Sequence, residues 1–433
     1  MTARTFPVAP PAEPPAEPPA LRLVQLAWLA AAVFVVSAGY GAFMPMLPGW
    51  LTLAAPGMTA TDIARHVGFL SAAYAAGVLI GAPLWGVVSD RTGRGRILII
   101  GLIGYVASLL LLLVPGSTGL WSLYALRGAT GFFVAAVAPV VAALVAEHTP
   151  EKQRARRFAW LGAVSLLGFL FGPGLNALAD WAGSWAGART DSPVSAAQIV
   201  IALSALLGAV MMSGLAVTLP ASRAPDAAAR QNPVAAIESR VIALWWLSGT
   251  ATFVLAGFEL GIVLQGQLHT GLSSRQVAMM FAECSLVMLG VNALLFLTGW
   301  LEKLPARVLM STGLIVAMAG LGVLAGHRSE TWMYLGVSLA SAGTGLILPV
   351  IAYLAAGASP QSLGATMGGL AAAAGVGQTL GSFVGGWLFG MVAQGSFGWL
   401  ILPLAVLLLL LARPGWWLAV PAGPAVHEGT SRV

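Results

Sequence analysis

The chain has 433 residues and a formal net charge of +6, yet only 8% of its residues are charged and 58% are hydrophobic. Soluble domains carry roughly 25% charged residues, so this composition excludes an ordinary soluble domain. Uncharged runs of about 18 or more residues, long enough to cross a bilayer as helices, recur along the chain. No series of ten-residue segments alternates at period two, which excludes a membrane β-barrel. The sequence therefore predicts an all-α integral membrane protein.

The predicted elements, in chain order, form two sets of six. Residues 1–22 are rich in Pro, Ala and Glu and predict a disordered tail, and the first apolar run is too long for a cleaved signal peptide. Residues 23–219 predict an N-terminal six-helix bundle, with helices near 23–47, 66–88, 97–115, 119–146, 157–180 and 195–219. A polar linker is expected at 220–240. Residues 241–413 predict a C-terminal bundle, with helices near 241–266, 276–299, 307–326, 331–355, 362–391 and 397–413, followed by a tail at 414–433.

The basic residues predict the orientation. Cytoplasmic loops of membrane proteins carry an excess of Lys and Arg. With the N-terminus in the cytoplasm, 16 of the 21 basic residues fall on the cytoplasmic side. Four then fall outside, namely Arg65, Arg189, Arg275 and Arg328, and Arg127 falls within the membrane. Both termini are therefore expected in the cytoplasm, and the positive charge indicates topology rather than a nucleic-acid partner.

Short glycine motifs recur between the two halves. "RGATG" begins at Arg127 and "SAGTG" begins 214 residues later at Ser341, while Gly168 and Gly172 recur 209 residues later as Gly377 and Gly381. Similar offsets predict two related halves. Paired halves are typical of secondary transporters, whose substrate sites lie between the repeats near the midplane.

The loop after the second predicted helix reads "GVVSDRTGRGR", in which four of eleven residues are charged. Gly93 is expected to permit a sharp turn and Gly86 to permit close packing, since glycine has no Cβ. Asp90 is expected to pair with a nearby arginine or to cap a helix N-terminus. The alternative is an ordinary positively charged cytoplasmic loop.

This loop resembles a motif of the major facilitator superfamily, and specifically of its 12-helix proton-coupled drug and metabolite exporters. The family pattern is Gly, any residue, Leu, Ala, Asp, Arg, any residue, Gly, Arg, Lys. The chain matches it at Gly86, Asp90, Arg91, Gly93 and Arg94, with the Leu, Ala and Lys replaced. The resemblance implies a latch that holds the two halves together in the outward-facing state.

Three further motifs extend the resemblance. The first predicted helix ends in "GYGAFMPMLP" with Pro45 and Pro48, and the fourth carries Leu123, Arg127 and Gly131, although Thr130 stands where the family usually has Gln. The fifth carries the antiporter-associated residues Gly168, Gly172 and Pro173, but Asn176 replaces an expected Gly. Gly162, Gly168 and Gly172 are expected to form a smooth packing face, and Pro173 to bend the helix. The alternative is a packing face without any specificity for antiport.

Three ionisable residues fall deep within predicted helices, namely Arg127, Glu259 and Glu283, whereas Asp180 and Glu147 are nearer helix ends. A charge at the bilayer centre costs about 2.5 to 3.5 kcal/mol on insertion scales, so each residue requires a partner or a water-filled path. The rise of a helix places all three roughly 10 to 12 Å below the outer surface. We expect them to face one another across a central cavity, with Glu259 or Glu283 carrying a proton and Arg127 tuning it. Only the role of the arginine is implied by the resemblance. The alternative for each glutamate is a structural hydrogen bond.

Five side chains on the first, seventh and eighth predicted helices are candidates for lining a substrate cavity: Tyr40, Phe43, Phe258, Gln265 and Phe281. Packing is the alternative role for each of them. No nucleophile elbow, phosphate loop or His-Glu-x-x-His motif is present in the sequence, and the single cysteine permits no intramolecular disulfide. We therefore expect neither enzymatic activity nor a cofactor or metal.

The resemblance implies a proton-coupled exporter of a small drug or metabolite, active as a monomer in a bacterial inner membrane. Its expected partners are the bilayer, protons and a small-molecule substrate. Three alternatives remain open: a proton-coupled uptake symporter, a siderophore exporter, and a membrane enzyme or receptor-like protein. Helix 5 and the prolines of helix 1 favour export.

Overall fold

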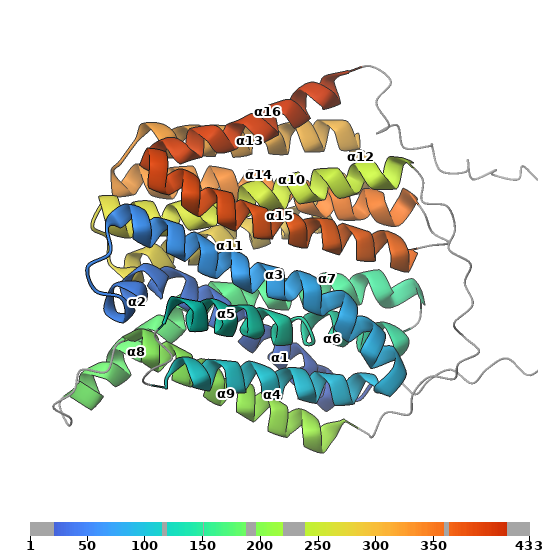
Figure 1. Cartoon of the computed structure of the whole chain (residues 1–433). Helices are drawn as coiled ribbons and strands as arrows, with labels where there is room; N and C mark the ends of the chain where they lie inside the picture. The colour runs from blue at the N-terminus through green and yellow to red at the C-terminus, as the bar shows by residue number, and fades with distance from the viewer. Residues whose placement is uncertain are drawn as a thin grey trace, which may run out of the picture.

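The computed structural model describes residues 21–114, 119–149, 151–187, 196–219, 239–358 and 363–413, and every regular element within them is helical. Residues 1–20 of the predicted N-terminal tail, residues 220–238 of the predicted linker and the predicted C-terminal tail lie outside these residues. The N-terminal helices are α1 (Leu23–Phe43), α2 (Leu47–Ala54), α3 (Ala60–Thr92), α4 (Arg94–Leu112), α5 (Leu120–Val134), α6 (Ala138–Glu147), α7 (Glu151–Leu170), α8 (Gly172–Gly187) and α9 (Ala196–Thr218) (Figure 1). The C-terminal helices are α10 (Ser239–Leu264), α11 (Ser274–Thr298), α12 (Trp300–Lys303), α13 (Ala306–Gly326), α14 (Glu330–Ala358), α15 (Leu363–Val392) and α16 (Ser396–Ala412).

Eleven helical segments within the described residues are long and apolar enough to cross a membrane. The last of them, Thr366–Ala412, has 47 residues and joins α15 to α16 through the short helix η5 (Ala393–Gly395). At 1.5 Å per residue it would extend roughly 70 Å, more than twice the thickness of a hydrocarbon core. This segment therefore contains the last two predicted spans, in agreement with the expected twelve.

Several boundaries differ from the expected ones. The first span does not end at its prolines but continues through η1 (Met44–Met46) into α2. Pro45 and Pro48 lie in the first turns of η1 and α2, where a backbone N–H has no partner to lose. The second span begins at Ala60, six residues earlier than expected, because the hydroxyl of Thr59 caps it by accepting a bond from the backbone N–H of Asp62.

The fourth and fifth spans are each divided in two. The fourth is interrupted between α5 and α6, where Pro139 occupies the first turn of α6. The fifth is interrupted at Phe171, between α7 and α8, and Pro173 is the second residue of α8. The proline expected to bend this span therefore follows the break directly.

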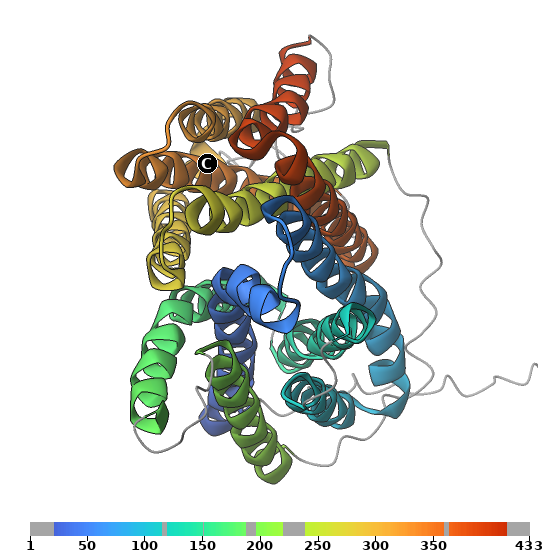
Figure 2. The same cartoon turned by 60° about the vertical axis from the view of Figure 1, so that its left-hand side comes forward.

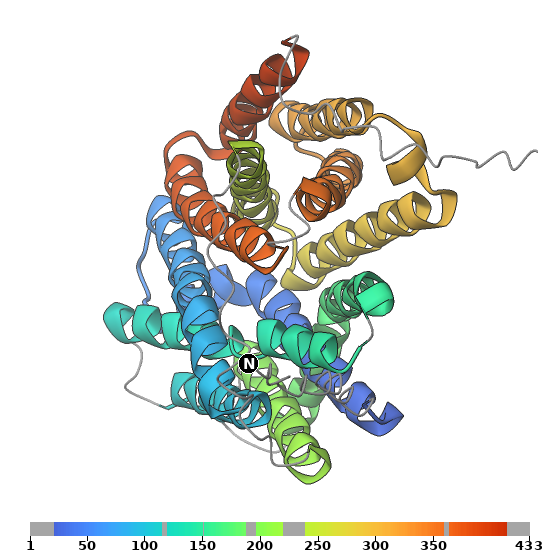
Figure 3. The ribbon, with the colours of Figure 1, turned by 90° about the vertical axis from the view of Figure 1, so that its right-hand side faces the viewer.

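The helices form two bundles, one of α1 to α9 and one of α10 to α16, which Figure 2 shows as blue-green and yellow-red groups. The bundles meet where α3 packs along α15, and where α7 and α8 pack against α11. The side-chain amide of Gln25 donates to the carbonyl of Thr218 at 3.0 Å, so the start of α1 and the end of α9 lie together. We call this end, which Figure 3 shows facing the viewer, the terminus-bearing end.

The glycine motifs form equivalent contacts in the two bundles. A Cβ on Gly168 would lie 2.4 Å from the carbonyl oxygen of Phe34 on α1. In the second bundle, a Cβ on Gly377 would lie 2.0 Å from the carbonyl oxygen of Gly249 on α10. Gly172 and Gly381 approach the same two helices one turn further along. The repeated glycines therefore let backbones approach closely at matching places.

Candidate functional site

Arg127 lies in the interior of the N-terminal bundle and is only 3% exposed. Its guanidinium lies over the rings of Phe43, at 4.8 Å, and Tyr74, at 4.6 Å. Its Nε and Nη2 atoms are buried and have no hydrogen-bond partner in the described part of the chain. A buried charge is costly unless it is paired or hydrogen-bonded. Cation–π contacts with two rings offset only part of this cost.

A small cavity of about 20 Å³ lies beside Arg127. One water molecule needs roughly 10 to 15 Å³ of such volume and two to four polar partners. The polar side chains that line the cavity are Arg127, Tyr40, Tyr74, Tyr105, Thr130 and Ser204. The space is therefore large enough and polar enough for one water that bonds the guanidinium.

Glu259 lies on α10 in the second bundle. It is surrounded by protein and yet is partly accessible to solvent. Its electrostatic neighbours include Tyr40 of the first bundle and Cys284 of its own bundle. The electrostatic neighbours given for Arg127 are three tyrosines rather than a carboxylate. Tyr40 interacts electrostatically with both Arg127 and Glu259.

Glu283 lies on α11 and faces α14 within the second bundle. The hydroxyl of Ser338 donates a short hydrogen bond to its Oε1 atom. Its Oε2 atom is buried, with no hydrogen-bond partner among the described residues. The structure therefore does not bring the three ionisable residues into one contact. The hydrogen bond from Ser338 fits the alternative role stated for Glu283, which is a structural hydrogen bond between helices.

The expected cavity residues occupy different surroundings. The ring of Tyr40 lies 5.1 Å from that of Tyr74 and 5.7 Å from that of Phe169, which in turn lies 5.6 Å from Phe281. These rings form a continuous aromatic path from α3 through α1 and α7 to α11, across the boundary between the bundles. Phe43 lines the small cavity, whereas Phe258 is fully buried in the core.

Gln265 begins η3 (Gln265–His269), a single π-helical turn that follows α10. It is 1% exposed, and both polar atoms of its amide have no hydrogen-bond partner in the described ranges. Two residues later, Gln267 donates a short hydrogen bond to the carbonyl of Pro45 in the other bundle. This segment therefore joins the bundles at the end opposite the termini.

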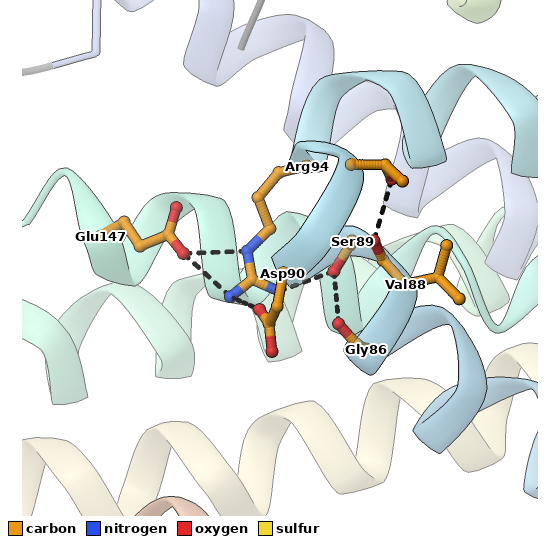
Figure 4. A network of polar contacts seen from close by, with 7 residues as sticks. Gly86, Val88, Ser89, Asp90, Arg94 and Glu147 are labelled. Atoms are coloured by element: carbon orange, nitrogen blue, oxygen red, sulfur yellow. Dashed lines mark hydrogen bonds and ion pairs between the residues drawn. The ribbon is translucent and has the colours of Figure 1, made fainter. Parts of the chain in front are cut away.

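The charged loop motif forms an ionic network inside the first bundle (Figure 4). Arg94 bonds Asp90 at 2.6 Å and Glu147 at 2.8 Å, and it donates to the hydroxyl of Ser89 at 2.7 Å. Gly93 has φ 100°, the left-handed conformation that the expected sharp turn requires. A Cβ on Gly86 would meet nothing within 4 Å, so the expected close packing at Gly86 is wrong for this conformation. Arg91 lies exposed in the last turn of α3.

The glycines of the fifth span also separate into two groups. Gly168 and Gly172 lie against α1, and a Cβ on either residue would approach backbone atoms of that helix at less than 3 Å. A Cβ on Gly162 would meet nothing within 4 Å, so the smooth face is shorter than expected. The described contacts of this face are made with α1 of the same bundle.

Close contacts between α3 and α15 lie toward the end opposite the termini. A Cβ on Gly68 would lie 2.7 Å from the Cα of Gly386, and the ring of Phe69 stacks on that of Phe383 at 5.0 Å. Further toward the terminus-bearing end, a Cβ on Gly86 or on Gly368 would enter open space. Contact between the two helices still reaches Gly375, where a Cβ would lie 3.0 Å from a side-chain carbon of Leu79, so the contacts run from the end opposite the termini past the middle of both helices.

Four polar residues of this region were not singled out from the sequence: Tyr74, Tyr105, Ser204 and Gln378. Each lies on a different helix, so no local pattern relates them to Arg127. The sequence contains one signal for Tyr74, because Gly131 of the "RGATG" motif packs directly on its backbone, where a Cβ would lie 2.0 Å from its carbonyl oxygen. This signal can be interpreted only once it is known which residues of α3 and α5 pack against each other.

Together, the fold and these side chains define a multi-pass helical membrane protein of two related bundles, with ionisable residues beside their common boundary. The model of the Major Facilitator Superfamily matches residues 29–295, and the chain belongs to this family. This result confirms the resemblance found in the loop motifs, and the family consists of transporters rather than enzymes.

The relatives found by sequence match only part of the chain. The class B tetracycline resistance protein of Escherichia coli is 44% identical over 138 residues, which are 31% of this chain and 32% of that protein. The quinolone resistance protein NorA of Staphylococcus aureus is 32% identical over 144 residues, 33% of this chain and 35% of that protein. The alignments thus span about a third of these relatives.

Solved structures match over nearly the whole chain. The human organic anion transporter MFSD10 superposes with a TM-score of 0.67 and 20% identity, covering 90% of this chain and 99% of that protein. A bacterial homologue of the human drug peptide transporters gives a TM-score of 0.66 with 14% identity, covering 90% of this chain and 97% of that one. At these identities the likeness shows the fold, and it confirms the all-helical two-bundle architecture.

Proposed function

We propose that the protein is a proton-coupled exporter of a small organic compound, such as a drug or a metabolite. The observation that carries the proposal is Glu259, a carboxyl group inside the protein that is partly accessible and lies within electrostatic range of Tyr40 in the other bundle. A group that exchanges a proton for a substrate needs such a place, because it must be shielded from bulk water and still be reached from the site.

Transport would proceed by alternating access, in which one bundle rocks against the other around a site between them. The excess of Lys and Arg supports a cytoplasmic position of the terminus-bearing end in a bacterial cell. The described conformation is then the inward-facing one. The protein would work as a monomer in the inner membrane, since each chain contains both bundles.

The loop network supports a latch. In this conformation, the described bonds of Arg94 go to Ser89, Asp90 and Glu147, all within the first bundle. A latch that has released the second bundle would have this arrangement. When the cytoplasmic end closes, Asp90 at the end of α3 and Arg94 at the start of α4 would lie where α3 approaches α15.

The direction of transport is supported by the partial relatives, whose names describe resistance to tetracycline and to quinolones. Export is the simplest way for a membrane protein of this family to confer resistance. An uptake symporter on the same fold is the second candidate, and a siderophore exporter is a third.

The first experiment identifies the substrate and the direction together. Untargeted mass spectrometry would compare cells and spent medium of matched strains that produce the intact protein or its Arg127→Ala variant at equal membrane levels. A compound enriched outside only with the intact protein supports export and names the substrate. A compound enriched inside would replace export by uptake.

A second experiment tests the coupling. Inverted membrane vesicles from strains producing Glu259→Gln or Glu283→Gln would be loaded with the identified compound under an imposed pH gradient. We expect Glu259→Gln to abolish gradient-driven accumulation. Because Glu283 is bonded to Ser338 within its own bundle, we expect Glu283→Gln to have the smaller effect. If both variants kept gradient-driven transport, neither glutamate would carry the proton.

A further inference from the structure

A groove lies on the surface of the first bundle, away from the boundary between the bundles. It is formed by Trp28 of α1 and by residues of α9 between positions 209 and 218, and its volume is about 520 Å³. The start of α1 and the end of α9 both lie on the side of the first bundle that faces away from the second (Figure 3). Because both helices span the membrane, the groove opens toward the bilayer rather than toward the proposed transport site.

The walls of the groove are apolar, and the protons of its two hydroxyl groups are already used. The hydroxyl of Ser213 donates to the carbonyl of Ala209 at 2.9 Å. The hydroxyl of Thr218 donates to the carbonyl of Gly214 at 2.6 Å. Gly214 also lets the ring of Trp28 lie directly against α9, since a Cβ there would come within 2.5 Å of the ring. A ligand in this groove would therefore be held by apolar contacts, as an aliphatic chain is.

The length of the groove matches the depth of one leaflet. Its lining on α9 runs from Ala209 to Thr218, the last residue of that helix. At 1.5 Å per residue, this stretch is about 14 Å long. Half of a ~30 Å hydrocarbon core is about 15 Å. An acyl chain that enters at the terminus-bearing end would therefore lie in the groove along most of its length.

The entrance of the groove has a positive charge beside it. Arg22 directly precedes α1 and is exposed. Its backbone N–H donates to the side-chain oxygen of Gln25 at 2.9 Å, and the amide of Gln25 donates to the carbonyl of Thr218 at 3.0 Å. These two bonds hold the start of α1 next to the last lining residue of α9. Within the described ranges, the ion pairs involve Arg94 and leave Arg22 available. A guanidinium at this level suits a phosphate group.

We propose that this groove is a binding site for an anionic phospholipid of the surrounding bilayer. One acyl chain lies along α9 against the ring of Trp28, and the phosphate binds the guanidinium of Arg22. A headgroup with a net negative charge is preferred, because the ammonium of a zwitterionic headgroup offsets the attraction to the arginine. The site is independent of the proposed transport function and of its direction.

The test is native mass spectrometry of the full chain in detergent, titrated with phosphatidylglycerol or with phosphatidylethanolamine of identical acyl chains. Arg22→Gln removes the charge. Its control is Arg307→Gln, because Arg307 is an exposed basic residue at the start of α13 in the other bundle. Ser213→Trp fills the groove. Its control is Leu206→Trp, because Leu206 is 60% exposed on the same helix but does not line the groove. Thermal unfolding would confirm that each variant folds.

We expect the parent to bind its first phosphatidylglycerol about fivefold more tightly than its first phosphatidylethanolamine, as one basic side chain near an anionic lipid implies. Arg22→Gln should remove most of this preference. Ser213→Trp should weaken the first binding of both lipids by about fivefold or more, because the apolar contacts of the chain are lost. Arg307→Gln and Leu206→Trp should behave like the parent.

Three results would overturn the proposal. Equal binding of the two lipids by the parent would contradict the choice of an anionic lipid. Equal losses of preference in Arg22→Gln and Arg307→Gln would show that the lipid responds only to the net charge of the protein. If Ser213→Trp bound both lipids as the parent does, the acyl chain would not lie in the groove, and another occupant, such as a second copy of the chain, would cover it.

Discussion

The two bundles share a packing frame but differ in chemistry. Thr130 and Thr344, 214 residues apart, each donate to the carbonyl one turn earlier on their own helix, at 2.7 and 2.9 Å. Gly131 packs on the backbone of Tyr74, and Gly345 packs in the same way on Met288. At the place equivalent to Arg127, however, the second bundle has Ser341, which is fully buried.

The glycine contacts occur in both bundles, whereas the charged side chain occurs in only one. Close backbone contacts depend on glycine at fixed places, so a change there affects the whole bundle, and both copies retain them. A charged side chain affects only its own surroundings, so one copy can lose it. The arginine is then in the first bundle and the partly accessible glutamate is in the second. The proposed coupling requires this asymmetry, because opposite charges on the two bundles make their approach depend on protonation.

The largest expected effect on transport comes from replacing Arg127, compared with replacing Ser341 at the equivalent place in the second bundle. Arg127→Ala should lower gradient-driven transport by about tenfold or more, within the range of typical coupling energies, because it removes the only cation of the small cavity in the described structure. Ser341→Ala should lower it by less than about twofold, since it removes only a neutral hydroxyl. Transport assays at matched expression would show this ratio. Equal losses would mean that the two places are functionally equivalent after all.

The repeated glycines should behave alike in the two bundles. Gly168→Ala and Gly377→Ala each force a Cβ against a backbone carbonyl, and each should destabilise the protein by about 1 to 3 kcal/mol. Gly162→Ala, whose Cβ enters open space, should change stability by less than about 0.5 kcal/mol. Thermal unfolding in detergent measures all three. A strong effect of only one of the two buried sites would contradict the shared frame.

The sequence predicted the number and order of the membrane spans better than the surroundings of the ionisable residues. Charge-free runs and the distribution of Lys and Arg define the number of spans, because these depend on composition alone. Pro45 and Pro48 were misleading as helix ends, since prolines in a first turn do not interrupt the chain of helices. Depth placed Arg127, Glu259 and Glu283 in one layer, but depth does not determine which face of a helix a side chain occupies. The tyrosines around Arg127 come from three helices, and only tertiary packing brings them together.

The turn at Gly93 should be sensitive to a single methyl group. In the second bundle, Gly299 also ends a helix, α11, with a positive φ of 66°. With φ at 100°, Gly93→Ala strains the backbone between α3 and α4 by about 1 to 3 kcal/mol. We expect a lower midpoint of thermal unfolding. Gly162→Ala is a useful comparison because Gly162 lies inside α7 and a Cβ there would meet nothing within 4 Å. If Gly93→Ala were no more destabilising than Gly162→Ala, the left-handed turn would not be required.

The smallest expected change in stability comes from the loop network, although its effect on transport should be clear. Asp90 and Glu147 both bond Arg94, and their side chains are 50% and 37% exposed. Such exposed ion pairs contribute about 0 to 1 kcal/mol each, so Asp90→Asn and Glu147→Gln should fold and reach the membrane. If Asp90 also acts as a latch in the opposite conformation, Asp90→Asn should lower transport more than Glu147→Gln, although both remove one carboxylate charge beside the same guanidinium. Transport rates normalised to the amount of protein in the membrane would show whether this holds. Unchanged transport by Asp90→Asn would contradict the latch, and the network would then only stabilise the first bundle.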